Sequence, residues 1–428
     1  MRRAFSPPAL RLFGQIGLVL CIALPFSAHA QQGPDSAQDD SNQKLLQRIN
    51  ELETKVKQLE EKQAPPAAPV AAAPAPAAPP PQPPAEVDIP VVNEVAPRLK
   101  LNVFGDVGAQ GFDGIPSSFE FGSLDLFMRA RLSDKVSVLG EVLFIAASDN
   151  SIEADVERLF LQYRQSDYFA ASIGRFHTAI GYYNTAFNKG EFLETTTDRP
   201  FIYAFDDQGG VLPMQDVGVS VTGKVPSGKL DLNYIVEVSN GRGWGVDAEP
   251  AQNSQDANTS KAINGGLFIR PEKFSGLQLG FSLRHDNLTI PAPAVHETIA
   301  TAYAVYVNSK YEILNEAILV RHTEPVAGSV FNTSAFYSQF SRAFGKFRPY
   351  FRYQYFNAPG NDPVYLFAGP NAYSPLTVTT FAGRINGPTA GVRWDFTEHS
   401  ALKLQYDRFD QRDLDTENGL TSQIAFTF

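Results

Sequence analysis

Residues 124–131 read Leu124-Asp125-Leu126-Phe127-Met128-Arg129-Ala130-Arg131. Apolar residues occupy every even position, and charged residues occupy three of the odd positions. A repeat of two is the period of a β-strand, whose successive side chains point to opposite faces. This stretch therefore predicts a strand with one apolar face and one polar face. Such a strand fits a wall between lipid and water.

The same alternation recurs throughout residues 98–428. Near the end of the chain, Leu402, Leu404 and Tyr406 alternate with Lys403 and Gln405. Sixteen segments follow the pattern, near 99–110, 120–132, 135–146, 154–165, 168–177, 214–224, 229–240, 262–270, 276–286, 298–308, 311–322, 332–343, 347–357, 388–397, 400–410 and 419–428. The number is even, as bacterial single-chain barrels require. We predict an all-β fold, a 16-stranded antiparallel transmembrane β-barrel preceded by a short α-helical coiled coil.

The connections between these segments alternate between short and long. Ser133-Asp134 and Pro226-Ser227-Gly228 are turn-like, whereas residues 178–213, 241–261, 287–297 and 358–387 form longer connections. Outer-membrane barrels have short periplasmic turns and long extracellular loops. The last strand ends in Phe428 and resembles the C-terminal strand of outer-membrane proteins.

Residues 1–30 are typical of a cleavable signal peptide. An arginine-rich start precedes a short apolar stretch, and Ala28-His29-Ala30 is a small-x-small cleavage site. The apolar stretch is too short for a transmembrane anchor, which is the alternative. The only cysteine, Cys21, lies inside this peptide, so we expect neither disulfides nor thiolate metal sites in the mature chain.

Residues 31–63 contain a predicted coiled coil, at about 41–63. Apolar residues recur at alternating steps of four and three, and charged residues occupy the flanking e and g positions. The a and d residues alone favour a dimer, but Arg48 and Glu53 belong to a short signature of parallel trimers, which we prefer. A single surface helix is the alternative. The expected trimerisation residues are Leu45, Arg48, Ile49, Leu52, Glu53, Val56 and Leu59.

Residues 64–97 form a Pro/Ala-rich linker. Its first part, 64–85, consists almost wholly of Ala, Pro, Val and Gln. Such segments adopt extended polyproline geometry, at about 3.1 Å per residue, and act as semi-rigid spacers. The stalk of coiled coil and linker would therefore extend into the periplasm.

Residues 98–428 resemble the phosphate-selective porin O/P-like superfamily. The resemblance is carried by Gly174-Arg175-Phe176-His177 through Gly181-Tyr182-Tyr183, by Arg199-Pro200 and by Gly209 to Pro213. A coiled coil before such a barrel resembles the DcaP-like porins within that group. The resemblance implies an outer-membrane porin, a passive channel for small hydrophilic solutes or ions, that assembles as a homotrimer.

The longest connection, 178–213, is the candidate pore constriction, because the resemblance implies that this loop folds into the barrel. A solvated outer loop is the alternative. Our hypothesis is that wall arginines face loop carboxylates across the constriction and create a transverse field. The loop residues are Glu191, Glu194, Asp198, Arg199, Asp206 and Asp207, and the wall residues are Arg129, Arg131, Arg158, Arg348, Arg352 and Arg393.

Strand alternation also predicts which other charges face the lumen, since a charge facing lipid costs about 2–4 kcal/mol for Arg or Lys at the midplane. The further basic residues are Arg270, Arg284 and Lys403, and the acidic ones are Asp106, Asp125, Glu141, Asp231, Glu237, Glu312, Glu316, Asp395 and Asp407. The loop has only one Lys and one Arg, and the whole chain has a formal net charge of −10. This departure argues against strong phosphate selectivity.

Three other functions fit the sequence less well. An outer-membrane enzyme would need a nucleophile motif or a metal-ligand spacing, and neither occurs. A TonB-dependent receptor needs a plug and about 22 strands. A structural tether that reaches the cell wall through the stalk is the main alternative. We predict no catalytic residues, metal, cofactor or nucleic-acid partner.

Overall fold

The computed structural model describes residues 98–114, 116–146, 151–187, 192–203, 212–242, 256, 258–288, 294–366, 383–412 and 416–428. The predicted signal peptide, coiled coil and linker lie outside the described residues, and so do the expected trimerisation residues Leu45, Arg48, Ile49, Leu52, Glu53, Val56 and Leu59. Three of the expected loop residues, Glu191, Asp206 and Asp207, also lie outside them.

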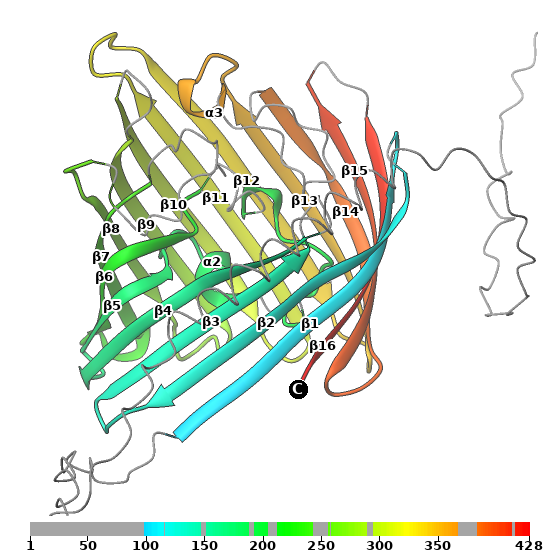
Figure 1. The fold of residues 1–428 in the computed structure, drawn as a ribbon, viewed down its shortest axis with the longest axis horizontal. Coiled ribbons are helices and arrows are strands. Elements are labelled where there is room, and N and C mark those ends of the chain that lie inside the picture. Colours follow the sequence, from blue (N-terminus) through cyan, green and yellow to red (C-terminus); the bar gives the residue numbers. More distant parts are fainter. Residues whose placement is uncertain are drawn as a thin grey trace, which may run out of the picture. The chain divides into compact units, whose positions relative to one another are not determined.

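Sixteen strands form a closed antiparallel barrel (Figure 1). The strands are β1 Arg98–Phe112, β2 Ser118–Arg131, β3 Val136–Ala146, β4 Ile152–Ser166, β5 Phe169–His177, β6 Gln215–Val225, β7 Leu232–Ser239, β8 Ala262–Ile269, β9 Leu277–Leu288, β10 Val295–Val307, β11 Tyr311–Thr323, β12 Val330–Arg342, β13 Phe347–Ala358, β14 Gly383–Asp395, β15 Ser400–Gln411 and β16 Glu417–Thr427. The short helices are α2 Tyr183–Ala186, α3 Pro363–Leu366, η1 Phe201–Tyr203 and η2 Gly228–Leu230. The predicted barrel and its strand number are confirmed.

The barrel closes where β1 pairs with β16. Asp106 lies opposite Ala425, and Val107 lies opposite Ile424. Closure pairs the backbone groups that an edge strand would leave without partners. Inside lipid, where water cannot replace those partners, only helices and closed barrels are stable.

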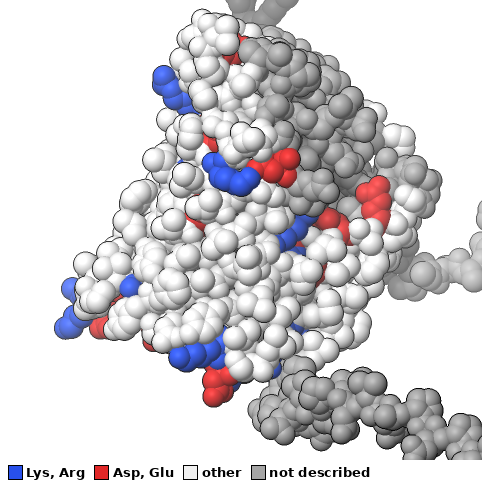
Figure 2. Space-filling model, turned by 60° about the vertical axis from the view of Figure 1, so that its left-hand side comes forward, with Lys and Arg blue, Asp and Glu red and all other residues white. Residues whose placement is uncertain are grey.

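The two faces of each strand have different chemistry. On β11 the buried side chains are Glu312, Leu314, Glu316, Ile318, Val320 and His322, and the residues between them are partly or fully exposed. Outward positions elsewhere carry large apolar side chains, with Leu404 47% exposed and Leu420 66% exposed. Figure 2 shows a broad outer surface with few charged side chains. An exposed apolar surface of this extent is typical of contact with lipid or with another protein.

The connections confirm the predicted division between the two ends of the barrel. One end has only short turns, such as residues 132–135, 308–310 and 396–399. The three longest connections, 178–214, 240–261 and 359–382, all lie at the other end. We call these the short-turn end and the loop end.

Three predicted positions need correction. The fourteenth strand was predicted near 388–397. It begins at Gly383, and the β14–β15 pairing passes from Asn386 to Thr389 without Pro388. Asp231, predicted on a strand, caps η2 in a short turn with a φ of 45°. Arg270 directly follows β8 rather than lying within it.

Most charges predicted on the inner face are buried in the barrel. These are Asp106, Asp125, Glu141, Arg158, Glu237, Arg284, Glu312, Glu316, Arg352, Arg393, Lys403 and Asp407. In the described part of the chain, no helix is long and apolar enough to cross a membrane.

Candidate functional site in the barrel lumen

The connection between β5 and β6 folds into the barrel (Figure 1). We call its described residues 178–187 and 192–203 the inward segment. Its base is closed by the backbone, since the Thr178 amide donates to the Met214 carbonyl at 2.9 Å. The Asn184 side-chain amide donates to the carbonyls of both Thr178 and Met214, at 2.8 and 2.9 Å. The two ends of the connection are therefore tied together at the wall.

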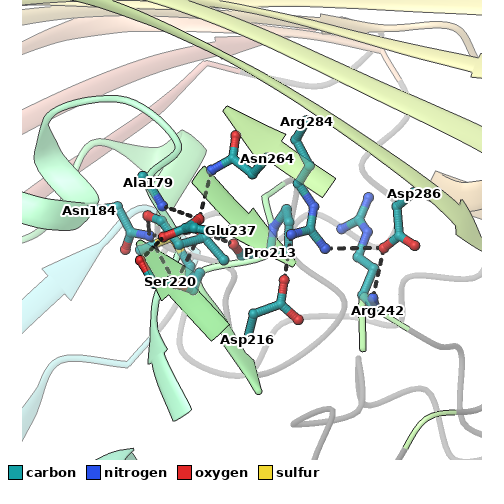
Figure 3. A network of polar contacts seen from close by, with 12 residues as sticks. Ala179, Asn184, Pro213, Asp216, Ser220, Glu237, Arg242, Asn264, Arg284 and Asp286 are labelled. Carbon is teal, nitrogen blue, oxygen red and sulfur yellow. Dashed lines mark hydrogen bonds and ion pairs between the residues drawn. The ribbon is translucent and has the colours of Figure 1, made fainter. Parts of the chain in front are cut away.

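Glu237 on β7 holds the start of the inward segment (Figure 3). Its carboxylate accepts a hydrogen bond from the Ala179 backbone amide at 3.0 Å. Asn264 and Ser220, from the neighbouring strands β8 and β6, donate to the same carboxylate at 2.7 and 3.3 Å. The strands on either side of β7 therefore orient the carboxylate that receives the segment.

A second buried network lies beside this anchor (Figure 3). Arg284 on β9 forms ion pairs with Asp216 on β6 and, at 3.1 Å, with Asp286. The Arg242 backbone amide donates to Asp286 at 2.9 Å, and its guanidinium pairs with Glu297 on β10. All five side chains are at most 4% exposed. Two guanidinium groups are therefore shared among three buried carboxylates, and these contacts form a structural ion-pair network on the inner wall.

Glu316 on β11 receives the first part of the segment, residues 179–187, which we call the first arm. Its carboxylate oxygens accept from the backbone amides of Tyr182 and Tyr183, at 2.6 and 3.0 Å. The hydroxyls of Tyr203 and Tyr337 also donate to it, the former at 2.9 Å. Four donors therefore converge on one buried carboxylate, which is 2% exposed.

The first arm approaches the wall closely because residue 181 is glycine. Gly181 has a φ of +73°, and a Cβ there would lie 2.1 Å from the Tyr203 hydroxyl and 2.3 Å from Glu316 Oε2. Above it, the Tyr183 ring stacks on Tyr203 at 5.4 Å and meets Tyr337 edge-on at 6.2 Å. The tyrosines pack with Ile180 and wall residues such as Leu314 in one apolar cluster inside the barrel.

Three wall cations receive the second arm, residues 192–199. Arg352 on β13 donates to the Asp198 carboxylate at 2.5 Å and to its carbonyl at 3.0 Å. Arg393 on β14 donates to the carbonyls of Phe192 and Glu194, at 2.6 and 2.8 Å. Lys403 on β15 donates to the Thr196 carbonyl at 2.8 Å. These cations bind the arm directly.

These contacts change the transverse-field hypothesis for Arg352 and Arg393, because both arginines bind the second arm directly. Arg352 and Asp198 form an ion pair instead of facing each other across a gap. Glu194 is 1% exposed, so its carboxylate does not line open solvent. Burial raises the pKa of Glu194, and the charges of Arg199 and Lys403 act in the opposite direction.

The other predicted wall arginines lie away from these contacts. Arg158 pairs with Glu141 on β3. Arg129 lies over the Phe127 ring at 5.3 Å, and Arg131 pairs with Asp134 in a short turn at 3.0 Å. Arg348 donates to Ser341 at 3.3 Å. The structure therefore brings together Asp198, Arg352 and Arg393, with Glu194 and Arg199 on the same arm, but not the remaining four arginines.

Glu237 and Glu316 were predicted only as lumen-facing acids, and their anchoring role was missed. The alternation of each strand places these carboxylates inside the barrel. Glu316 and Tyr182 are far apart in the sequence, so no local sequence pattern predicts that they are in contact. Among the described residues, no group of three His, Cys, Asp or Glu side chains is arranged to hold a metal ion.

No protein-family model and no curated protein sequence matches this chain. Its fold is similar to solved outer-membrane porins. The anion-selective porin from Comamonas acidovorans is 11% identical, with a TM-score of 0.55, and the match covers 78% of this chain and 100% of that one. The outer membrane channel DcaP of Acinetobacter baumannii is 10% identical, with a TM-score of 0.51 and coverage of 77% and 97%. The trimer form of OmpT from Vibrio cholerae is 11% identical, with a TM-score of 0.52 and coverage of 78% and 100%. The barrel thus has the porin fold.

Proposed function

We propose that this protein is an outer-membrane porin, a passive diffusion channel for small hydrophilic solutes, in which the inward segment narrows the pore. The observation that carries the proposal is the fixed position of this segment, bound to the inner wall at Glu316 and Arg352. Barrels of sixteen to eighteen strands leave an aqueous channel. A segment anchored inside such a channel reduces its open cross-section.

Two further observations support this function. The outer surface is apolar along the strands, which suits a barrel surrounded by lipid. The similar solved structures include a protein described as an anion-selective porin and one described as an outer membrane channel. These observations support a barrel in the outer membrane, and we propose from the sequence pattern alone that the stalk lies in the periplasm.

We also propose that the chain forms a homotrimer. The signature formed by Arg48 and Glu53 supports a parallel three-stranded coiled coil, whereas the a and d residues alone favour two strands. One of the similar structures is described as a trimer form. In this arrangement the stalk would join three barrels on the periplasmic side.

Planar-bilayer recordings of the purified protein test this function. We expect open channels whose conductance rises with salt concentration, and steps that arrive in threes. The reversal potential in a salt gradient would then give the sign of the preferred ion. A folded barrel that never conducts would contradict the porin proposal and would favour the structural tether.

A further inference from the structure

A cavity of about 480 Å³ lies between the first arm and the inner wall formed by β6 to β10. Ala179, Gly181 and Tyr182 line it from the arm. Its lining extends to Asp167 and Arg270 in two connections of the short-turn end. Ligand pockets of about 300–1,000 Å³ accommodate small organic molecules. The anchoring contacts described above do not occupy this space.

One side of the cavity is aromatic. Tyr303 on β10 lies directly opposite Gly280 on β9, and a Cβ at residue 280 would come 2.4 Å from the Tyr303 ring. The glycine therefore lets the ring lie across the neighbouring strand. The Tyr182 ring packs beside it, with centroids 5.7 Å apart. Together the two rings offer an apolar surface to a planar group.

The other side of the cavity is cationic. Three basic residues line it, Arg164, Lys224 and Arg270, against one acidic residue, Asp167. Lys224 is paired with Asp231 at 2.8 Å. Arg270 instead hydrogen-bonds to an uncharged group, the Gln278 side chain, at 2.8 Å, and its guanidinium lies 4.8 Å from the Phe268 ring centre. Among the described residues, no carboxylate forms an ion pair with Arg270.

Gln278 holds the Arg270 guanidinium in position relative to the Tyr303 ring. Its side-chain oxygen accepts from Arg270 Nε at 2.8 Å, and its nitrogen donates to the Tyr303 hydroxyl at 2.8 Å. One amide therefore sets the positions of both groups before any ligand arrives. Because Nε is engaged, the two terminal guanidinium nitrogens remain to meet a ligand. A carboxylate suits such a pair of donors.

We propose that this cavity binds a small aromatic carboxylate, with its carboxylate group on Arg270 and its ring against Tyr303 and Tyr182. Aromatic rings pack favourably in offset or edge-on arrangements, so the cavity should bind an aromatic carboxylate more tightly than an aliphatic one. This proposal rests on the porin function proposed above. It adds a class of solute that binds inside the channel during its passage.

Calorimetry on the detergent-folded full chain, with benzoate as the probe, tests the site. Acetate lacks the ring and benzyl alcohol lacks the charge, so benzoate should bind at least about tenfold more tightly than either. Arg270→Gln should weaken benzoate about tenfold and leave benzyl alcohol unchanged. Arg270→Lys, which keeps the charge but loses the paired donors, should give an intermediate loss.

The matched control is Arg342→Gln, which removes the same charge from the last residue of β12, at the same end of the barrel, where its guanidinium lies over the Tyr311 ring. This variant should bind benzoate as the unmodified protein does. An equal loss in both variants, or benzoate binding no tighter than acetate, would overturn the proposal. Tyr303→Leu should weaken both benzoate and benzyl alcohol, and unchanged binding there would overturn the aromatic part.

Calorimetry separates this inference from the channel proposal, because binding in detergent does not require conduction. Benzoate binding to a barrel that never conducts would support the site and contradict the porin. Conduction without benzoate binding would support the porin and overturn the binding site. In a conducting channel, benzoate should also block the current in a saturable way, and Arg270→Gln should abolish that saturation.

Discussion

The two arms of the inward segment are bound by opposite chemistry. The first arm donates backbone amides to the carboxylates of Glu237 and Glu316. The second arm presents carbonyls and one carboxylate to Arg352, Arg393 and Lys403. At most of these contacts the wall supplies the charge and the segment supplies a backbone dipole, whereas Asp198 meets Arg352 with a charge of its own.

The side chains at the two main anchoring contacts differ in their exposure to water, although residues 194–197 of the second arm are themselves buried. Tyr183 and Tyr203, the latter beyond the arm itself, are 2% and 1% exposed within an apolar cluster, whereas the Asp198 side chain is 38% exposed. A hydrogen bond lost where water cannot enter leaves its partners unsatisfied, which costs more than the same loss near solvent. The first arm should therefore be the main anchor, and the second arm the adjustable part.

The largest effect should come from Gly181→Val. A side chain there meets Tyr203 and Glu316, in a backbone conformation that already costs about 1–3 kcal/mol for other residues. We expect the first arm to leave the wall, with the largest rise in single-channel conductance and a clear loss of stability against urea. Gly328→Val is the control, since Gly328 has a similar φ of +72° with nothing within 4 Å. Equal effects of the two variants would show that backbone strain at a positive φ, and not contact with Tyr203 and Glu316, causes the change.

Removing the anchor carboxylate should have the next largest effect. Glu316→Ala leaves buried amides and hydroxyls without their acceptor, at about 1–3 kcal/mol for each that stays unsatisfied. Urea unfolding in lipid vesicles would measure the loss, and conductance should rise. Glu312→Ala is the comparison on the same strand, because Glu312 accepts from Thr195 at 3.1 Å and Gln339 at 2.9 Å. If Glu312→Ala destabilises more, the first arm is not the main anchor.

Arg352→Ala should have a smaller effect on stability, of about 1–2 kcal/mol, because water can solvate the exposed part of Asp198. The change should also shift the reversal potential towards cations, since one positive charge leaves the lumen while Asp198 stays. Arg352→Lys should keep the ion preference but lose part of the stability. An unchanged reversal potential in Arg352→Ala would mean that this pair does not face permeating ions.

The smallest effect concerns Glu194, whose pKa is raised by burial. A carboxyl with a higher pKa in the folded state than in the unfolded state loses stability as the pH rises through that range. Glu194→Gln should therefore match the original protein near pH 4 and become relatively more stable towards pH 7. Urea unfolding at the two values would show the difference. Relative destabilisation at pH 7 would mean that Arg199 and Lys403 outweigh burial.

The strand pattern could be predicted because it depends on neighbours in sequence. Leu404 and Gln405 point to opposite faces whatever the rest of the chain does, so alternation places the barrel wall and most of its inner charges. The role of each inner charge could not be predicted in this way. Arg158 and Arg352 have the same place in the pattern, yet Arg158 pairs with Glu141 on the preceding strand and Arg352 pairs with the second arm.

The sequence by itself determined the sixteen-stranded wall, its apolar outer face, its charged inner face and the long connection after β5. The tertiary structure decided which inner charges bind that connection, and it formed the cavity beside Arg270. The physical reason is distance along the chain. Alternation acts between adjacent residues, whereas the contacts of Glu316 with Tyr182 and of Arg352 with Asp198 join residues far apart in the sequence and exist only in the folded barrel.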